Sequence, residues 1–208
     1  MIGIFGGTFD PIHFGHLRPA LEVFQDLHFN ELRWIPSRQP PHRDHPDVSI
    51  EHRLNMLQLA LQGVDHSVID ECEIQRPGPS YMFDTLTSLR QRFPQTGLAL
   101  ILGMDAFNGL QGWHRWRELL QLTHIVVCSR PGVDLPVSGE LQAVIEAARV
   151  DDGSRLHNTG SGLIYFHPVT ALQISATKIR NICQQGKNPR FLLPANVCDY
   201  IEEHGLYR

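Results

Sequence analysis

The sequence lacks the features that mark secreted, membrane-spanning and disulfide-rich proteins. Neither a basic leader nor a long apolar run accompanies the short apolar segment at residues 1–5, which disfavours both secretion and a membrane span. The cysteines form no C-x-x-C pair, so we expect reduced thiols packed as small apolar groups and a cytoplasmic location. The four cysteines are Cys72, Cys128, Cys183 and Cys198.

The chain also lacks an excess of positive charge. Lysine and arginine total 18 against 22 acidic residues, a formal net charge of −4. A broad electrostatic surface for nucleic acid is therefore not indicated. Any positive potential must be local, as a small anionic ligand requires.

Two common nucleotide-binding signatures are missing as well. Gly6 and Gly7 do not begin a G-x-G-x-x-G run, and the pair Gly186-Lys187 is followed by Asn188 rather than by serine or threonine. A dinucleotide-dependent dehydrogenase and a Walker-type ATPase are therefore disfavoured.

Short β-rich runs alternate along the chain with amphipathic stretches. This alternation predicts an α/β fold, a Rossmann-like doubly wound parallel sheet with helices on both faces, in which ligands bind beyond the carboxyl ends of the strands. At 208 residues we expect one domain, 1–208, with a small C-terminal helical part from about 175 to 208. The expected strands are 1–5, 32–36, 67–69, 98–102, 125–128 and 163–166, the helices include 17–27, 50–61 and 83–93, and the loops are 36–46, 132–139 and 151–162.

Residues 6–16, Gly-Gly-Thr-Phe-Asp-Pro-Ile-His-Phe-Gly-His, follow the first expected strand. Gly6 and Gly7 let the backbone approach a ligand, and the following helix would carry His13 and His16 on one face of its first turns. Two imidazoles beside a helix N-terminus suit a polyphosphate that gains charge during reaction. A zinc site is the alternative, but no cysteine or carboxylate follows closely on that helix face. We therefore predict no protein-held metal.

A second segment with phosphate-binding character lies near the other end, at residues 174–180, Ile-Ser-Ala-Thr-Lys-Ile-Arg. Ser175 is a good helix N-cap and Thr177 lies just inside the helix, so hydroxyls and free N–H groups can meet phosphate oxygens, with Arg180 one turn further on. Lys178 stands where a capping box would have glutamate. A cation at that end of a helix is unfavourable without an anion nearby, and a bound polyphosphate would remove the conflict.

Residues 8–16 read as the T-x-D-P-x-H-x-G-H form of the H-x-G-H signature of the nucleotidylyltransferase superfamily, and residues 174–180 as its second signature, I-S-x-T-x-I-R. Further segments narrow the match, and together they resemble the bacterial nicotinate mononucleotide adenylyltransferases over essentially the whole chain. These segments are Ile35-Pro36, Pro40-Pro41-His42-Arg43, Pro79-Ser80-Tyr81, Gly103-Met104-Asp105, Trp113-His114, Ser129-Arg130-Pro131-Gly132, and the ending with Leu192-Leu193-Pro194 and Gly205-Leu206-Tyr207.

The resemblance implies an adenylyltransferase that joins ATP and nicotinate mononucleotide into nicotinate adenine dinucleotide (deamido-NAD) and pyrophosphate, in NAD biosynthesis. Catalysis would fall to Thr8, His13, His16 and Arg180, and either histidine could be the more important. We expect His16 to stabilise the α-phosphate in the transition state and His13 to lie nearer the β- and γ-phosphates. The residues expected to bind ATP are Gly6, Gly7, Phe9, His13, His16, Gly103, Asp105, Arg130, Ser175, Thr177 and Arg180.

The same resemblance assigns the pyridine nucleotide to a second group of residues. To prefer a carboxylate over a carboxamide, this pocket should offer hydrogen-bond donors only. Position 82 departs from the family, which usually has threonine there; if that residue acts through its backbone N–H the change is harmless, and if through a hydroxyl it is not. The expected residues are Thr8, His42, Tyr81, Met82, Trp113 and His114, with Arg43 beside them.

Mg²⁺ is expected to arrive with ATP, held mainly by substrate and water. Asp10 could fix its turn by hydrogen bonds or contact the metal, and Arg130 could meet a phosphate or stack on adenine. Three alternatives stay open: the same chemistry on nicotinamide mononucleotide or pantetheine phosphate, a cytidylyltransferase, and an inactive nucleotide-binding regulator. The expected partners are small molecules, with no nucleic acid or membrane, and the protein is a monomer or a homo-oligomer.

Overall fold

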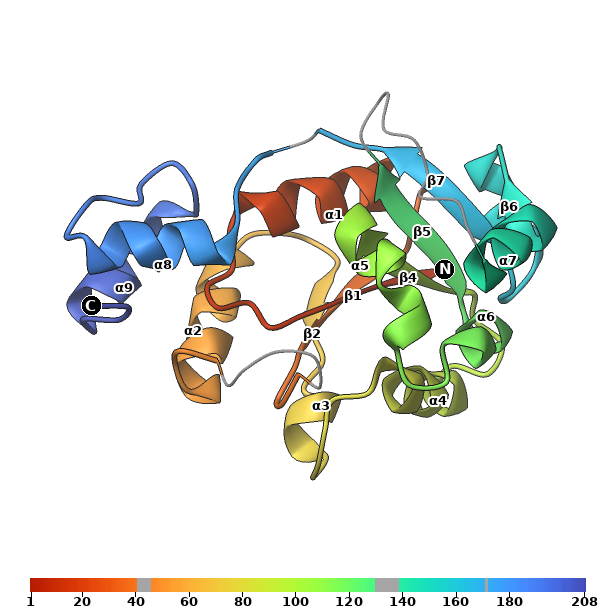
Figure 1. Ribbon diagram of the computed structural model, residues 1–208, viewed down its shortest axis with the longest axis horizontal. Coiled ribbons are helices and arrows are strands. Elements are labelled where there is room, and N and C mark those ends of the chain that lie inside the picture. Colours follow the sequence, from red (N-terminus) through yellow and green to blue (C-terminus); the bar gives the residue numbers. More distant parts are fainter. Residues whose placement is uncertain (41–45, 130–138, 171) are drawn as a thin grey trace.

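Consecutive short apolar strands form one parallel sheet. The computed structural model describes residues 1–40, 46–129, 139–170 and 172–208. Within these ranges the sheet has seven strands in the order β3-β2-β1-β4-β5-β7-β6, and every neighbouring pair is parallel (Figure 1). The strands are β1 (Ile2–Gly7), β2 (Glu31–Pro36), β3 (Ser67–Ile69), β4 (Leu98–Gly103), β5 (His124–Ser129), β6 (Arg149–Val150) and β7 (Ile164–Pro168).

Helices connect the strands and follow the last of them. Most α-helices cover a face of the sheet, whereas the 3₁₀ turns lie in the connections. The α-helices are α1 (Phe14–Asp26), α2 (Ile50–Ala60), α3 (Cys72–Gln75), α4 (Met82–Arg92), α5 (Met104–Asn108), α6 (Leu119–Leu122), α7 (Glu140–Ala148), α8 (Ala176–Gln184) and α9 (Ala195–Glu203), and the 3₁₀ helices are η1 (Leu110–Gly112), η2 (Trp116–Glu118) and η3 (Gly153–Asn158).

Alternate side chains of each strand point to opposite faces, and this period of two divides the core. In β4, Leu100 lies in the same apolar cluster as Leu86 of α4. Its neighbour Ile101 lies in the other cluster, with Val23 of α1 and Met56 of α2. Side chains of α5, α6 and α7 belong to the first cluster, and side chains of α8 and α9 to the second. The expected Rossmann-like doubly wound sheet with helices on both faces is therefore confirmed.

Most expected elements are present with small differences at their ends. The strand at 67–69 has the expected bounds, β4 and β5 extend further to Gly103 and Ser129, and the expected helices correspond to α1, α2 and α4. The strand β6 was not expected, because two residues carry no periodic signal. The prediction of a loop throughout 151–162 is wrong, since η3 lies within it and begins where the Asp152 carboxylate accepts a hydrogen bond from the Ser154 N–H.

The C-terminal helices lie at one end of the molecule, beside α2 and remote from α7 (Figure 1). The last helix has the expected limits, with Pro194 before it and Gly205, at φ +60°, after it. The Asn196 side chain joins this part to α2 by donating to the Leu59 carbonyl oxygen at 2.7 Å.

Two further features concern the cysteines and the length of the helices. All four cysteines are free thiols, and Cys128 and Cys198 are buried. No helix in the described part of the chain has both the length and the apolarity to span a membrane.

Candidate active site

The strand β1 ends where the direction of strand addition changes. Its neighbours are β2 on one side and β4 on the other, and such a switch point opens a crevice beyond the carboxyl ends of the strands. Gly6 and Gly7 form the last two residues of β1, and the Ser37 N–H donates to the Gly7 carbonyl oxygen at 2.9 Å. The Gly-Gly segment therefore lies at the edge of the sheet where the fold favours ligand binding.

His13 and His16 come together, but not by the predicted geometry. His13 is the N-cap residue of α1 with extended backbone, φ −154° and ψ 170°, so the expectation that both histidines lie within the helix is wrong. His16 occupies the first turn, and the two rings stack with their centroids 3.7 Å apart. The extended backbone at His13 turns its ring back over the helix start, which produces the shared site.

Burial keeps the His13 imidazole neutral. The side chain is 3% exposed, and this desolvation lowers its pKa from 6.5 to about 4. Its Nδ1 atom has no hydrogen-bond partner among the described residues. At pH 7 His13 can therefore donate from one ring nitrogen without adding a positive charge beside His16.

The loop between β1 and α1 contains a residue with left-handed backbone conformation, and hydrogen bonds hold the residue that follows it. Phe9 has φ +51°, a conformation that is rare for a bulky side chain, and its ring lies edge-on to the His16 ring at 5.5 Å. The Asp10 carboxylate accepts from the Tyr207 hydroxyl at 2.7 Å and from the Asp47 N–H at 2.8 Å. Of the two roles considered for Asp10, these contacts support fixing the loop, although its partners are distant in sequence.

The second signature packs directly against the first. Ser175 is the N-cap of α8, with its hydroxyl oxygen accepting from the Lys178 N–H at 3.2 Å, as its sequence position predicts. A Cβ atom on Gly15 would lie only 2.9 Å from the Ile174 carbonyl oxygen and 2.9 Å from the His13 ring. Glycine therefore lets the start of α8 approach the histidine pair, and exposed Thr177 follows in the first turn of α8.

The Arg180 side chain has protein partners that sequence reasoning did not foresee. Its Nη1 donates to the Asp10 carbonyl oxygen at 2.8 Å, and its Nε forms an ion pair with the Asp47 carboxylate. Arg180 thus joins the two signatures. Its contact with pyrophosphate stays a prediction, and a phosphate would have to compete with the Asp47 carboxylate for the guanidinium.

Part of the expected acceptor pocket also assembles beside β1. A Cβ atom on Gly6 would lie 2.6 Å from the terminal methyl of Met82, so the N-terminus of α4 abuts the Gly-Gly segment. The rings of Tyr81 and His114 lie 4.5 Å apart, and partly buried Trp113 packs against the apolar cluster that includes Phe83 of α4. The structure therefore brings together two separate segments that were assigned to the pyridine nucleotide, 81–82 and 113–114, and places the first of them against Gly6, which was assigned to ATP.

The remaining expected residues lie at the ends of neighbouring strands or outside the described residues. Gly103 ends β4, and a Cβ atom there would meet no described atom within 4 Å beyond its chain neighbours. Exposed Asp105 lies in the first turn of α5. Both residues therefore lie at the end of the strand next to β1. His42 and Arg130, together with Arg43, fall outside the described residues.

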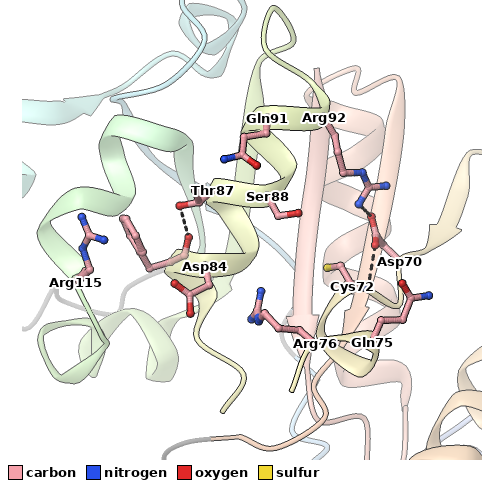
Figure 2. A pocket seen from close by; sticks show the side chains of 11 residues that line it. Asp70, Cys72, Gln75, Arg76, Asp84, Thr87, Ser88, Gln91, Arg92 and Arg115 are labelled. Carbon is pink, nitrogen blue, oxygen red and sulfur yellow. Dashed lines mark hydrogen bonds and ion pairs between the residues drawn. The ribbon is translucent and has the colours of Figure 1, made fainter. Parts of the chain in front are cut away.

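A cavity of about 830 Å³ lies elsewhere, along the outer side of α4. Figure 2 shows its lining side chains, including Arg92 in its ion pair with Asp70. Neither His13 nor His16 lines this cavity, and no residue of the second signature lines it. The cavity is therefore not the candidate site. Among the described residues no cluster of three or more histidine, cysteine or acidic side chains is arranged to hold a metal ion.

Sequence reasoning missed three residues that shape this site. Asp47 and Tyr207 hold Asp10, and Arg53 of α2 donates to the Thr8 carbonyl oxygen at 2.6 Å. An arginine in an amphipathic stretch carries no signal of burial. The ending that contains Tyr207 contributed to the family resemblance, and that was the available hint of its role.

Comparison with known proteins places the chain by sequence. The family model described as cytidylyltransferase-like matches residues 4–182. A Methylococcus capsulatus protein bearing the name "Probable nicotinate-nucleotide adenylyltransferase" is 47% identical over 208 residues, which covers 100% of this chain and 99% of that protein. A protein of the same name from Pseudomonas syringae pv. tomato is 48% identical over 100% of this chain and 93% of its own length.

Solved structures show the same architecture at lower sequence similarity. The Plasmodium falciparum nicotinic acid mononucleotide adenylyltransferase complexed with APC has a TM-score of 0.75 at 16% identity, covering 99% of this chain and 96% of that chain. The structure of that enzyme complexed with NaAD gives a TM-score of 0.72, also at 16% identity. The fold is thus shared, and the full-length identity to the bacterial relatives shows that this chain belongs to the nicotinate-nucleotide adenylyltransferase family.

Proposed function

We propose that this protein joins ATP and nicotinate mononucleotide to give nicotinate adenine dinucleotide (deamido-NAD) and pyrophosphate, a step of NAD biosynthesis. The observation that carries the proposal is the contact between the two signatures at the end of β1, where Ile174 lies against Gly15. Two imidazoles and a helix N-terminus around one space suit a triphosphate.

The reaction is a direct in-line substitution at the α-phosphorus of ATP. An oxygen of the acceptor's 5′-phosphate forms the new bond, the bond to the β-phosphate oxygen breaks, and pyrophosphate leaves with that electron pair. A phosphate monoester is already anionic at pH 7, so the protein need supply neither a nucleophile nor a strong base. Its task is alignment and stabilisation of charge.

The two histidines supply hydrogen-bond donors to the triphosphate. We assign His16 to the α-phosphate and His13 to the β- and γ-phosphates. A neutral His13 avoids repulsion within the stacked pair before substrate binds, and an arriving polyphosphate favours its protonation. The backbone of Gly7 and Phe9, with Thr8, would hold the attacking phosphate.

Pyrophosphate would be held at the N-terminus of α8. Ser175, Thr177 and the free N–H groups of the first helical turn provide donors there, and the anion would offset Lys178 at the positive end of the helix. For Arg180 to join them, a phosphate has to replace the Asp47 carboxylate at its Nε. The higher charge of a triphosphate favours that exchange.

Specificity for nicotinate would come from the group around Tyr81, Met82 and His114. Methionine at position 82 has no hydroxyl, so a contact with the carboxylate there has to use the backbone N–H at the start of α4. Carboxylate binding at a helix N-terminus is electrostatically favourable. Trp113 would stack on the pyridine ring, while Gly103 and Asp105 would adjoin the adenosine.

Mg²⁺ fits this site as a companion of ATP. The Asp10 carboxylate already accepts two hydrogen bonds, from the Tyr207 hydroxyl and the Asp47 N–H, which leaves it poorly suited as a metal ligand. When bound to the triphosphate, Mg²⁺ reduces the repulsion that the attacking phosphate meets. We further propose that the chain acts in the cytoplasm as one nucleotidyltransferase domain with small-molecule partners, as a monomer or a homo-oligomer.

The test is pyrophosphate release from Mg²⁺-ATP with different acceptors. Nicotinate mononucleotide should be used far better than nicotinamide mononucleotide or pantetheine phosphate, and ATP far better than CTP. Equal use of both pyridine nucleotides would contradict the proposed donor-only pocket but not the proposed adenylyl transfer. Release only with CTP would indicate a cytidylyltransferase, and binding of ATP without turnover on any acceptor would indicate an inactive nucleotide-binding regulator.

A further inference from the structure

Arg53 lies beneath the loop that precedes the histidines. Its side chain is 1% exposed, although it belongs to a helix that borders solvent. The Nη1 atom donates to the Thr8 carbonyl oxygen at 2.6 Å and to the Ser37 carbonyl oxygen at 2.8 Å, and Nη2 reaches the Arg38 carbonyl oxygen at 3.4 Å. One guanidinium therefore ties together the segments that follow β1 and β2.

Arg53 is a buried cation that makes no direct ion pair with any residue that the structure describes. Within the described residues no carboxylate lies at ion-pair distance from it, and Nε has no hydrogen-bond partner. Burial lowers the pKa of the guanidinium, and the negative charge of Asp10 acts in the opposite direction. Burying such a group is costly unless its donors are used, so the backbone carbonyls that it binds matter to this part of the fold.

The bound carbonyl of Thr8 belongs to the peptide that leads into Phe9. Phe9 has positive φ and packs edge-on against His16, and Asp10 after it is held by Tyr207. Arg53 thus fixes one side of a strained residue, and the Asp10 contacts fix the other. Strain of this kind persists only where the surroundings over-determine the conformation.

We propose that Arg53 is a positioning residue for adenylyl transfer: by holding the carbonyls of Thr8 and Ser37 it sets the Thr8–Phe9 peptide against the attacking phosphate and keeps Phe9 under His16. This inference rests on the proposed function. It assigns Arg53 no contact with substrate. A displacement of about 1 Å in such a site can cost about a hundredfold in rate, so loss of this support reduces kcat more than it weakens binding.

The chain offers a matched arginine for comparison. Arg90 of α4 also donates to backbone carbonyls, including those of Leu122 at 2.6 Å, Thr96 at 2.7 Å and Gly160 at 2.9 Å. These carbonyls precede β4, β5 and β7 and therefore lie at the amino edge of the sheet, whereas Arg53 lies at the carboxyl edge. Replacing Arg90 removes comparable structural bonds at a distance from the proposed site.

The experiment compares Arg53→Met, Arg53→Lys and Arg90→Met with the unchanged protein. Melting temperatures and folded fractions are measured first by circular dichroism. The values of kcat and of KM for ATP and nicotinate mononucleotide are then measured well below each melting temperature. Arg53→Lys keeps the positive charge and loses the guanidinium that reaches several carbonyl oxygens at once. It therefore tests the inference even where Arg53→Met does not fold.

The expected result is a fall in kcat of about tenfold to a hundredfold in Arg53→Met and a smaller fall in Arg53→Lys, with KM values within about threefold. Arg90→Met should keep kcat within about twofold at a similar loss of melting temperature. The inference is overturned if the Arg53 variants keep kcat, if only KM changes, or if Arg90→Met loses as much activity. Turnover by the unchanged protein tests the proposed function separately.

Discussion

The stacked histidines illustrate how individual residues set the charge of this site. Two imidazolium ions with ring centroids 3.7 Å apart would repel each other, and burial of His13 favours its neutral form. His13 therefore provides an N–H donor without a fixed charge. Helix N-termini and basic side chains such as Arg180 add electrostatic attraction for phosphate.

The lowered pKa of His13 predicts a pH dependence of stability. Between pH 6.5 and about 4 the unfolded chain binds a proton at this position and the folded chain does not, so acidification lowers the free energy of unfolding. The loss from this residue should reach about 3 kcal/mol and level off below pH 4. Urea denaturation of the unchanged protein and of His13→Asn at several pH values measures it. A stability difference between the two that stays constant from pH 7 to pH 4 would contradict this assignment.

Gly15 makes a second prediction at the residue scale. Alanine normally stabilises a helix by up to about 1 kcal/mol relative to glycine. Here its Cβ would lie 2.9 Å from both the His13 ring and the Ile174 carbonyl oxygen, so Gly15→Ala should destabilise the fold and reduce activity. Gly160→Ala is the control, since a Cβ atom there would meet no described atom within 4 Å beyond its chain neighbours. Melting temperatures and turnover rates of the two variants test this prediction. An active, stabilised Gly15→Ala would refute the close approach of Ile174 and His13 to Gly15.

Residues with local signals were predictable, and residues with distant partners were not. Ser175 caps its helix as expected because capping depends on the next few residues. His13 lies before the helix rather than within it, and its ring is buried, and a spacing rule reports neither feature. The contacts of Arg53 and Arg180 join segments far apart in the sequence, and their positions in helices gave no indication of them.

At the scale of elements, the end of the chain supports the loop that carries the first signature. The Tyr207 hydroxyl reaches Asp10 after α9, while α8 contacts the same loop through Arg180. The C-terminal helices are therefore coupled to the site. Composition and pattern predicted that these helices form, because Pro194 and Gly205 mark the limits of the last one. The contact with Asp10 was beyond such rules.

Replacing Tyr207 by phenylalanine tests this coupling. The substitution removes the hydroxyl and leaves one oxygen of a buried carboxylate without its donor, which should cost about 1–3 kcal/mol of stability. Tyr200→Phe serves as the control, because the Tyr200 hydroxyl contacts His52 and Asn55 in a more exposed setting and should contribute less. Urea midpoints at equal m-values give the comparison. Equal losses of stability in the two variants would show that the hydrogen bond from Tyr207 to Asp10 stabilises the fold no more than the contacts of the Tyr200 hydroxyl do.

At the scale of the whole molecule, the order of strands and helices was predictable from the sequence pattern, whereas the contact between distant segments was not. Alternation of strands and helices implied the doubly wound sheet, and the switch point beside β1 follows from its strand order. The approach of Ile174 to Gly15 brings opposite ends of the sequence together. The resemblance of both segments to one superfamily linked them in function, while their contact distance required the folded chain.

The central claim is that the paired signatures catalyse adenylyl transfer to nicotinate mononucleotide. Its most direct test is the simultaneous measurement of pyrophosphate and deamido-NAD formed from Mg²⁺-ATP and nicotinate mononucleotide, by the unchanged protein and by folded His16→Ala. We predict equal amounts of the two products and a loss in the variant of about a hundredfold, or about 3 kcal/mol of barrier. Pyrophosphate without deamido-NAD, or an undiminished rate in His16→Ala, would contradict the account.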